Sequence, residues 1–430
     1  MREVIIAIPS ASAEAMRQIF EVCRRTGARF RTVPTRGELE RGAARISQIR
    51  LVDLEDLLGR EVVNLDQQAL RHGLSGRRVL VTGAAGSIGR ELARQVAAYD
   101  PEELVLVDRN ENNLFYLEAD LRASHPLQSL VPVVGDVLDR RRIESLFNDL
   151  RPEIVFHAAA YKHVPLMEQN PVEAIKNNIL ATRDMAQIAA SHRVERFIYV
   201  STDKAVNPAG VMGATKRLGE RLMRSIDGSA TRFMAVRFGN VLDSDGSVIP
   251  TFRRQIAAGG PVTVTHPEAS RYFMTIPEAA ELVLMAGAMG EGGEIFLLQM
   301  GQPVRIVDLA TNMIELSGLK PDEDIKIVFT GLRPGEKLHE ELKGENETAL
   351  PTPNEKIMVL TGVEPLGEEG WQLFKSLEEA ALAERADAAL AVLKLLVPGY
   401  DPVAARTRLQ PQPARKIVGF GAKRRVDSQA

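Results

Sequence analysis

The chain has 430 residues, of which 45% are hydrophobic and 26% are charged. This length allows two or three domains with a full core, and the apolar content excludes a disordered or fibrous protein. The formal net charge of -3 gives no indication of a nucleic-acid groove or of an electrostatic membrane anchor, so we expect a small-molecule partner.

Three further features concern the compartment. The single cysteine, Cys23, cannot form an internal disulfide, and the first residues lack the long apolar segment of a secretory signal. No run reaches the roughly 18 consecutive apolar residues of a membrane-spanning helix. The sequence therefore predicts a cytoplasmic chain that does not cross a membrane.

The N-terminal part predicts a small α/β unit. Residues 3–9 and 29–33 have the pattern of buried strands, and Ser10 or Ser12 can cap a helix that runs to about residue 26. A polar stretch follows. We interpret residues 1–70 as a partial α/β module with a linker.

From Arg77 onward, apolar strands alternate with amphipathic helices. The expected strands are Val79–Thr82, Leu104–Asp108, Val131–Val134, Ile154–Ala158, Phe197–Ser201 and Met234–Phe238, and a later one spans Ile325–Phe329. Strands that are apolar on both faces and separated by helices predict a doubly wound parallel sheet in an α/β fold. The expected organisation is a dinucleotide-binding domain at 71–240, a smaller substrate-binding lobe at 241–410 that is interleaved with it, and a tail at 411–430.

A glycine-rich turn indicates the cofactor. Gly83, Gly86 and Gly89 lie between a strand and a helix, where a backbone turn and a helix N-terminus can hold a pyrophosphate. About twenty residues later Asp108 ends the next strand, where its carboxylate can accept hydrogen bonds from ribose hydroxyls, so NAD is expected. Arg109 leaves NADP as the alternative, because a guanidinium can pair with a 2'-phosphate.

Several motifs together carry a family resemblance. They are Ser201-Thr-Asp-Lys204, Met212-Gly-Ala-Thr-Lys216, His157-Ala-Ala-Ala-Tyr-Lys-His-Val-Pro165, Arg237-Phe-Gly-Asn240 and Arg271-Tyr-Phe-Met-Thr-Ile276. From about residue 51 to 402 the chain resembles the extended short-chain dehydrogenases. Within them it is similar to the bacterial UDP-N-acetylglucosamine 4,6-dehydratases of the polysaccharide-biosynthesis (CapD-like) kind, in a subgroup with methionine for the usual tyrosine. The membrane segments of that family are absent from this sequence, and its members are often anchored to the cytoplasmic face of the inner membrane.

The resemblance implies a reaction and a role for each catalytic candidate. A hydride passes from sugar C4 to NAD, water leaves across C5 and C6, and the hydride returns to C6. Asp203 would be the acid toward O6, Lys204 the base toward C5, Thr202 a hydrogen-bond partner of O4, and Lys216 a ligand of the nicotinamide ribose. Lys204 can act as a base only if its pKa falls, which we expect from burial beside Lys216. Met212 cannot take the O4 proton, and we assign that step to Asp203, acting through Thr202 or a water.

Further candidates follow from the motifs and the resemblance. Besides Lys216, the cofactor candidates are Gly83, Ala85, Gly86, Ser87, Ile88, Gly89, Asp108, Arg109, Asn110, Asp136, Val137, Ala158, Ala159, Ala160 and Asn177. The candidates for the nucleotide sugar are Lys162, His163, Asn240, Ser247, Val264, Thr265, Arg271, Arg333 and Glu336. Arg271 and Arg333 would bind the diphosphate, and Glu336 would accept from the uridine ribose.

Two other functions stay open at this point. A UDP-sugar 4-epimerase would normally need tyrosine at position 212 and has no use for the acid and base at 203 and 204. A non-catalytic sensor of dinucleotides or nucleotide sugars is the second alternative. We expect no metal, because the histidines lack ligand spacing, no nucleic-acid partner, and a homodimer or larger homo-oligomer.

Overall fold

The structure is a computed structural model that describes residues 3–8, 15, 18–19, 22, 29–33, 50–51, 67–226 and 230–402. Strands β1 (Glu3–Ile6) and β2 (Arg29–Thr32) pair in parallel, and β3 (Arg50–Leu51) is antiparallel to β2. The two expected N-terminal strands are therefore confirmed. Most of the expected helix between them, the linker before residue 67 and the tail at 411–430 lie outside the described residues.

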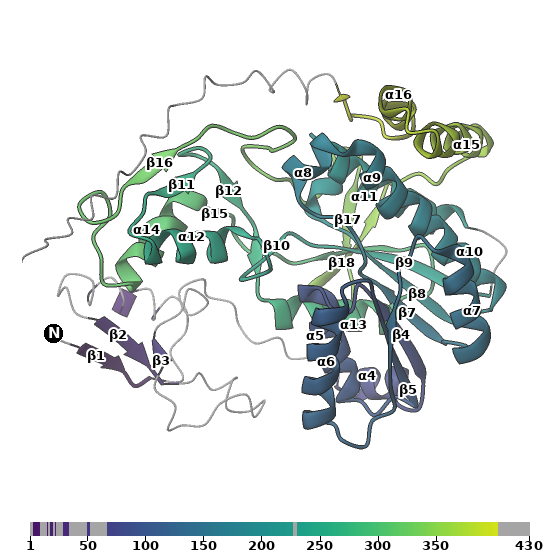
Figure 1. Cartoon of the computed structure of the whole chain (residues 1–430), viewed down its shortest axis with the longest axis horizontal. Coiled ribbons are helices and arrows are strands. Elements are labelled where there is room, and N and C mark those ends of the chain that lie inside the picture. Colours follow the sequence, from purple (N-terminus) through teal and green to yellow (C-terminus); the bar gives the residue numbers. More distant parts are fainter. Residues whose placement is uncertain are drawn as a thin grey trace, which may run out of the picture.

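A large sheet forms the centre of the described structure (Figure 1). Its nine strands run in the order β17-β18-β14-β9-β8-β7-β4-β5-β6. Their bounds are β4 Arg78–Thr82, β5 Glu103–Asp108, β6 Leu130–Val134, β7 Ile154–His157, β8 Arg196–Val200, β9 Arg232–Arg237, β14 Ile295–Leu298, β17 Thr348–Pro351 and β18 Ile357–Thr361. All neighbours from β14 to β6 are parallel, whereas β17 and β18 add an antiparallel edge. The six strands expected between residues 79 and 238 are all present.

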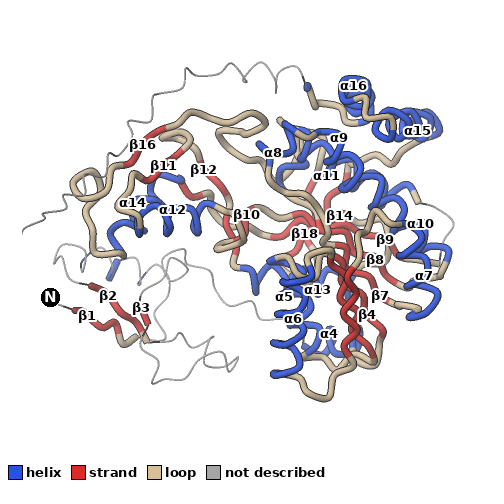
Figure 2. Tube along the Cα trace, in the orientation of Figure 1, coloured by secondary structure: helices blue, strands red, loops and turns tan. Residues whose placement is uncertain are grey.

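Helices cover both faces of this sheet (Figure 2). One face packs against α7 (Arg140–Leu150), α9 (Pro171–Ile175), η1 (Lys176–Leu180), α10 (Ala181–Ser191), α11 (Val211–Ser225), α15 (Glu368–Leu382) and α16 (Ala386–Leu396). The other face packs against α4 (Gln67–Leu74), α5 (Ser87–Ala97), α6 (Glu111–Ser124) and α13 (Ile276–Met289). Helix α8 (Val164–Gln169) precedes α9. The predicted doubly wound α/β fold is confirmed.

The period-two alternation of side chains explains why two cores form. In β4, Leu80 belongs to the core on the α11 side, while Val79 and Val81 belong to the core on the α5 side. Successive side chains of a strand point to opposite faces, so a strand that is apolar at every position is buried on both. Such strands place their carboxyl ends, where polar residues follow, at one edge of the sheet.

A smaller lobe with its own core lies beside this sheet (Figure 1). It comprises α12 (Val248–Ala257), β11 (Val262–Val264), β12 (Ser270–Arg271), β15 (Val304–Arg305), α14 (Ile306–Leu316) and β16 (Ile327–Phe329). Strand β10 (Asn240–Val241) pairs with β13 (Phe273–Met274) where the chain enters and leaves the lobe. The chain after residue 240 therefore supplies this lobe, the strands β14, β17 and β18 of the large sheet, and the helix α13 that packs on that sheet. Among the described residues, no helix is both long enough and apolar enough to cross a membrane.

Candidate active site

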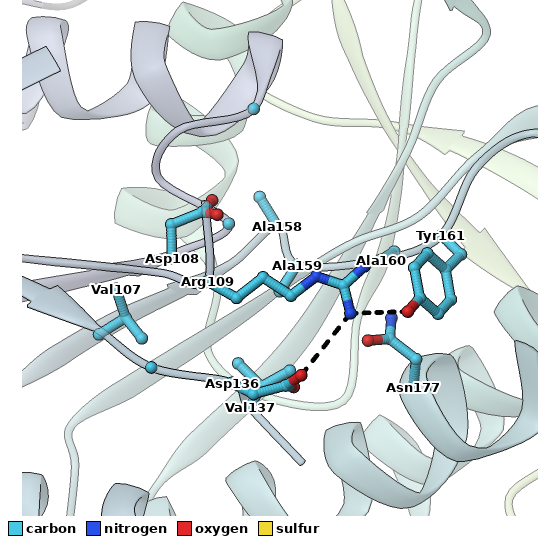
Figure 3. Close-up of a pocket in the computed structure, with 13 residues that line it drawn as sticks. Val107, Asp108, Arg109, Asp136, Val137, Ala158, Ala159, Ala160, Tyr161 and Asn177 are labelled. Carbon is cyan, nitrogen blue, oxygen red and sulfur yellow. Dashed lines mark hydrogen bonds and ion pairs between the residues drawn. The ribbon is translucent and has the colours of Figure 1, made fainter. Parts of the chain in front are cut away.

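A pocket lies where the strand order reverses, between the carboxyl ends of β4 and β7. Strands β5 and β6 lie on one side of β4, and the next strand in sequence, β7, pairs with β4 on its other side. The pocket is lined by Gly83, Gly86, Val107, Asp108, Arg109, Gly135, Asp136, Val137, Ala158, Ala159, Ala160, Tyr161 and Asn177 (Figure 3). Such a crevice is the usual ligand site of open α/β sheets. Ten of the cofactor candidates line it, whereas Ala85, Ser87, Ile88, Gly89, Asn110 and Lys216 do not.

The glycine-rich turn is fixed by close backbone contacts. Gly83 has a φ of 65°, and a Cβ at Gly89 would lie 2.0 Å from the carbonyl oxygen of Gly83. Only glycine permits that packing of α5 against the turn. Ala85 does not line the pocket, but its amide donates to Asp108 Oδ2 at 2.9 Å and thereby ties the turn to the end of β5. Asn110 has a structural role, because its side chain caps α6.

Arg109 extends across the pocket toward Tyr161 (Figure 3). Its Nη1 donates to the Tyr161 hydroxyl at 2.6 Å and lies 3.6 Å from Asp136 Oδ2, and its guanidinium lies 4.6 Å from the ring centroid of Tyr161. A guanidinium held in this way is both stacked and charge-paired. Tyr161 belongs to the His157–Pro165 motif but is not among the predicted cofactor residues, although its position shortly after the end of β7 indicates this edge of the sheet.

A short π-helix supports the same wall of the pocket. Asn177 and Asn178 belong to η1, and Asn178 both accepts from the Tyr161 amide and donates to the Tyr161 carbonyl, at 2.8 and 3.0 Å. Asn178 also donates to Thr215 of α11. Single π-helical turns often occur at functional sites. Asn178 therefore links this pocket to the helix that carries Met212 and Lys216.

The reaction candidates form a hydrogen-bonded cluster just beyond β8. Residues Asp203–Ala205 form the 3-10 helix η2, which the Thr202 side chain caps. The Thr202 hydroxyl donates to Asp203 Oδ1 at 2.9 Å, and Lys204 Nζ donates to the same oxygen at 3.0 Å and to Asn240 Oδ1 at 2.6 Å. Asp203 is fully buried, and its Oδ2 has no hydrogen-bond partner among the described residues. Four of the predicted residues are thus brought together.

The cluster contains a second acid that sequence reasoning missed. Glu340 is only 9% exposed, and its Oε1 lies 4.0 Å from Lys204 Nζ and 3.6 Å from Arg271 Nε. Burial lowers the pKa of Lys204, but Asp203 and Glu340 outweigh it, so this pKa is raised above its ordinary value. The expectation that burial beside Lys216 lowers the pKa of Lys204 is therefore wrong, because two carboxylates face its ammonium.

Helix α11 packs directly on this cluster. A Cβ at Gly213 would lie 2.1 Å from the Lys204 carbonyl oxygen, so glycine alone permits the contact. One residue earlier, Met212 is 3% exposed and packs in the core. Lys216 is 6% exposed, donates to the Val200 carbonyl at 2.8 Å and lies 4.5 Å from the ring centroid of Tyr199.

Lys216 should make the stability of the ligand-free chain depend on pH. Burial lowers its pKa to about 7, against a partial opposing effect of Glu220. Between pH 7 and roughly 10.5 the unfolded chain binds more protons at this site, so the free energy of unfolding should rise with pH, by on the order of 1 kcal/mol per unit. Urea unfolding at pH 7, 8 and 9 should show this slope, and Lys216→Met should flatten it. Parallel slopes for the two proteins would contradict the assignment.

The candidates for the nucleotide sugar fall into two groups. Lys162, His163 and Arg333 lie near one another: burial, then the charges of Lys162 and Arg333, lower the pKa of His163. Arg333 is 58% exposed and pairs with Glu336, its Nε donating to Glu336 Oε1 at 3.1 Å. From the sequence, Arg333 is assigned to the diphosphate and Glu336 to the uridine ribose, whereas in the structure the two side chains form an ion pair with each other.

Arg271 lies deeper in the protein. Its guanidinium donates to the carbonyls of Ser270, Leu338 and Lys337 at 2.7 to 3.0 Å, and it faces Glu340. The structure therefore places Arg271 beside the reaction cluster.

Three other substrate candidates lie in or beside the small lobe. The Ser247 hydroxyl is buried without a partner among the described residues, whereas the Val264 carbonyl accepts from the Thr330 amide. Thr265 directly follows β11, the strand that ends at Val264.

Comparison with known proteins finds relatives that are named for polysaccharide biosynthesis or for reactions of UDP-sugars. It is 50% identical over 360 residues to "Capsular polysaccharide biosynthesis protein CapD" of Staphylococcus aureus, which covers 83% of this chain and 60% of the relative. It is 32% identical over 282 residues to a "UDP-N-acetylglucosamine 4,6-dehydratase (inverting)" of Campylobacter jejuni, covering 64% of this chain and 80% of the relative. The chain thus spans about three fifths of the length of the S. aureus protein.

Two further matches extend this comparison. A "UDP-glucose 4-epimerase" of Rickettsia canadensis is 34% identical over 283 residues, with 64% of this chain and 79% of the relative covered. The X-ray structure of Pen from Bacillus thuringiensis superposes with a TM-score of 0.62 at 34% identity, covering 68% of this chain and 92% of Pen. The family model described as "Polysaccharide biosynthesis protein" matches residues 79–362, about two thirds of the sequence. The chain therefore belongs to the polysaccharide biosynthesis protein family.

Proposed function

We propose that this chain dehydrates UDP-N-acetylglucosamine across C4, C5 and C6, with NAD as a cofactor that is regenerated in each cycle. The observation that carries the proposal is the cluster of Thr202, Asp203 and Lys204, in which an acid and a base share hydrogen bonds at the end of β8. That strand neighbours β7, whose carboxyl end lines the cofactor pocket. The C. jejuni dehydratase among the relatives supports the same reaction.

The pocket suits a dinucleotide. The turn at Gly83 and Gly86 would hold the pyrophosphate, and Asp108 the adenosine ribose. When bound, the nicotinamide ring supplies a hydride acceptor for C4 and a hydride donor for C6. The structures of NAD-bound relatives are under 25% identical and support only the fold.

The chain's own residues would handle the protons. Thr202 would accept the O4 proton and pass its own hydroxyl proton to Asp203 Oδ1, the oxygen to which that hydroxyl already donates. Lys204 would take the C5 proton, and Asp203 would return the O4 proton to O6, so that the C6 hydroxyl leaves as water. Lys204 would then return its proton to C5.

Met212 separates this proposal from epimerisation. A 4-epimerase needs a group that takes and returns the O4 proton, which a thioether cannot do. Tyr199 cannot replace a tyrosine at 212, because its hydroxyl is fully buried and a Cβ at Gly219 would lie 2.3 Å from it. A partly buried lysine beside an aspartate has a clear use in dehydration and none in epimerisation.

Product analysis tests the function directly. The chain should convert UDP-N-acetylglucosamine with catalytic NAD into a 4-keto-6-deoxy sugar, which NMR identifies by the new C6 methyl signal. Accumulation of UDP-N-acetylgalactosamine would instead establish the epimerase. Tight binding of the sugar without any product would establish a sensor.

NAD should bind at least about tenfold more tightly than NADP, a difference of about 1.4 kcal/mol. In the proposed binding mode Asp108 would face the 2'-phosphate of NADP, and like charges repel, while Arg109 is engaged by Tyr161 and Asp136. Calorimetric titration of nucleotide-free protein measures both affinities. Asp108→Asn should reduce the difference between the affinities for NAD and NADP. Tighter binding of NADP by the unaltered chain would refute the assignment of NAD as the cofactor.

Arg333→Ala should raise KM for the UDP-sugar about 10- to 100-fold, the effect of losing one charged hydrogen bond, with little change in kcat. A diphosphate contact is the same in the ground and transition states, so it affects binding alone. Steady-state kinetics measure both constants. Lys320→Ala is the control, since this exposed lysine of the same lobe pairs only locally with Glu323. A loss confined to kcat would move Arg333 away from the diphosphate.

A further inference from the structure

Glu340 is a buried acid for which the proposed reaction has so far no role. It follows His339, which is held by an isolated bridge to Ser270 and by a hydrogen bond between its Nδ1 and the Ser270 hydroxyl. This fixes the backbone that carries Glu340 against β12. Its carboxylate consequently lies between the ammonium of Lys204 and the guanidinium of Arg271, 4.0 and 3.6 Å away.

Glu340 and Lys204 share most of their charged neighbours. Lys204 faces Asp203, Glu340 and Arg271, and Glu340 faces Lys204, Asp203, Arg271 and Lys337. Two carboxylates thus oppose one ammonium and one guanidinium in the buried part of the cluster. Arginine does not lose its proton in proteins, and the Lys337 ammonium donates to the Val206 carbonyl and to Glu341, so the cationic proton within 4.0 Å of Glu340 that can move is that of Lys204.

The raised pKa of Glu340 favours such a move, whereas the raised pKa of Lys204, which Asp203 and Glu340 together cause, opposes it until the sugar binds. Burial and the neighbouring Asp203 raise the pKa of Glu340, against the opposing charges of Lys204, Arg271 and Lys337. Burial also disfavours the charged form of Lys204. A substrate that expels the remaining water strengthens the effect of burial on both groups, because burial disfavours the carboxylate of Glu340 and the ammonium of Lys204 alike.

The proposed function, on which this inference rests, needs two proton acceptors before water is lost. The O4 proton must go to one group, and the ammonium proton of Lys204 must leave before its nitrogen can take a proton from C5. Asp203 is bonded to Thr202 and is committed to the O4 proton. Glu340 is the other carboxylate that the described structure brings near Lys204 Nζ.

We propose that Glu340 is the internal acceptor of the Lys204 proton, so that the base is generated by a transfer inside the closed site. One N–H bond of the ammonium breaks and one O–H bond forms on Glu340, and the ion pair becomes a neutral amine and a neutral carboxylic acid. The distance of 4.0 Å must shorten, or one water must bridge it, when the sugar binds. Glu340 acts through Lys204, and Arg271 holds its carboxylate in place.

The alternative role for Glu340 is purely electrostatic, and it predicts the opposite result. A fixed negative charge keeps Lys204 protonated, so its removal would lower the pKa of Lys204 and improve the base at neutral pH. Internal transfer requires the acceptor, so its removal forces the proton to leave to solvent. The two roles are thus distinguished by the sign of the change in kcat.

Glu340→Gln tests this, with Glu340→Asp and Glu341→Gln beside it. Glu341 is the adjacent exposed acid, which pairs with Lys337 and Asn207. We expect Glu340→Gln to lower kcat about 10²-fold at pH 7, with kcat rising tenfold per pH unit above it, while the wild type is flat. Glu340→Asp should keep the flat profile, and Glu341→Gln should match the wild type throughout.

Single-turnover measurement of the two halves of the reaction separates this role from a structural one. Reduction of bound NAD by the sugar uses Thr202 and Asp203, so its rate in Glu340→Gln should stay close to that of the wild type while product formation slows. Equal loss of both steps, a gain in kcat at pH 7 or an unchanged pH profile would each overturn the proposal. A wild type that reduces no NAD would remove the proposed function itself and this inference with it.

Discussion

Lys204→Ala should lower the rate of dehydration by about 10³-fold, within the range for loss of one general base, and should leave NAD reduction by the sugar measurable. The amine is the group placed to take the C5 proton, whereas O4 is served by Thr202 and Asp203. Binding of the UDP-sugar should change little, because the diphosphate candidate Arg333 pairs with Glu336, outside this cluster. Stopped-flow absorbance of NADH and NMR of the product measure the two steps separately.

The alanine variant also leaves Asp203 buried without its ammonium partner, so a second variant is needed. Lys204→Gln keeps a donor toward Asp203 and Asn240 but has no basic nitrogen. It should fold like the wild type and show the same loss of dehydration. Lys375→Ala, which alters an exposed lysine on α15, is the matched control. Turnover near the wild-type rate in Lys204→Gln would show that another group removes the C5 proton.

The main architecture could be predicted from the sequence because it depends on local patterns. Strands β4 and β5 are apolar at most positions, and β4 is followed by Gly83 while β5 ends at Asp108. The strand type, the sheet type and the edge that carries the site can therefore be predicted together. The antiparallel edge strands β17 and β18 were not expected. Most of their positions are exposed or only partly buried, without regular alternation, and their place in the sheet depends on the pairing of β18 with β14, which is distant in sequence.

Local patterns predict the site where its residues closely follow a strand, whereas Asn177, Lys216 and Arg271 lie within other elements and were predicted with the help of the family resemblance. Thr202, Asp203 and Lys204 meet this condition, and so do the pocket residues after β7. Glu340 does not, because it lies far along the chain and reaches Lys204 only through the bridge between Ser270 and His339. The raised pKa of Lys204 has the same origin: a sequence shows the lysine and its neighbour Asp203 but not the second carboxylate that opposes burial.

Arg237→Ala should destabilise the chain by about 3–5 kcal/mol, the usual effect of removing one partner from a buried ion pair. Arg237 is 0% exposed and donates to both oxygens of Glu220, at 2.9 and 2.7 Å, and to Glu347 Oε2 at 2.7 Å. These contacts join β9, α11 and the segment before β17. Burial opposes ionisation of Glu347, but hydrogen bonds and charge from Arg237, with the charge of Arg217, lower its pKa to about 2.

The pH dependence identifies the cause of that loss. In the wild type the ionised Glu347 binds fewer protons than in the unfolded chain, so its contribution is present above about pH 4.5 and is lost as pH falls toward 2. Without Arg237, Glu347 stays buried with too little positive charge beside it, so its pKa should rise above that of the unfolded chain. The folded variant then binds more protons than its unfolded chain, so its loss in the free energy of unfolding relative to the wild type should shrink as pH falls from 7 to 5.

Urea unfolding at both pH values measures this loss. The control is Lys394→Ala, which breaks an exposed pair with Asp401 and should change stability by at most about 1 kcal/mol. A deficit of equal size at both pH values would mean that lost packing, and not uncompensated charge, makes Arg237 necessary.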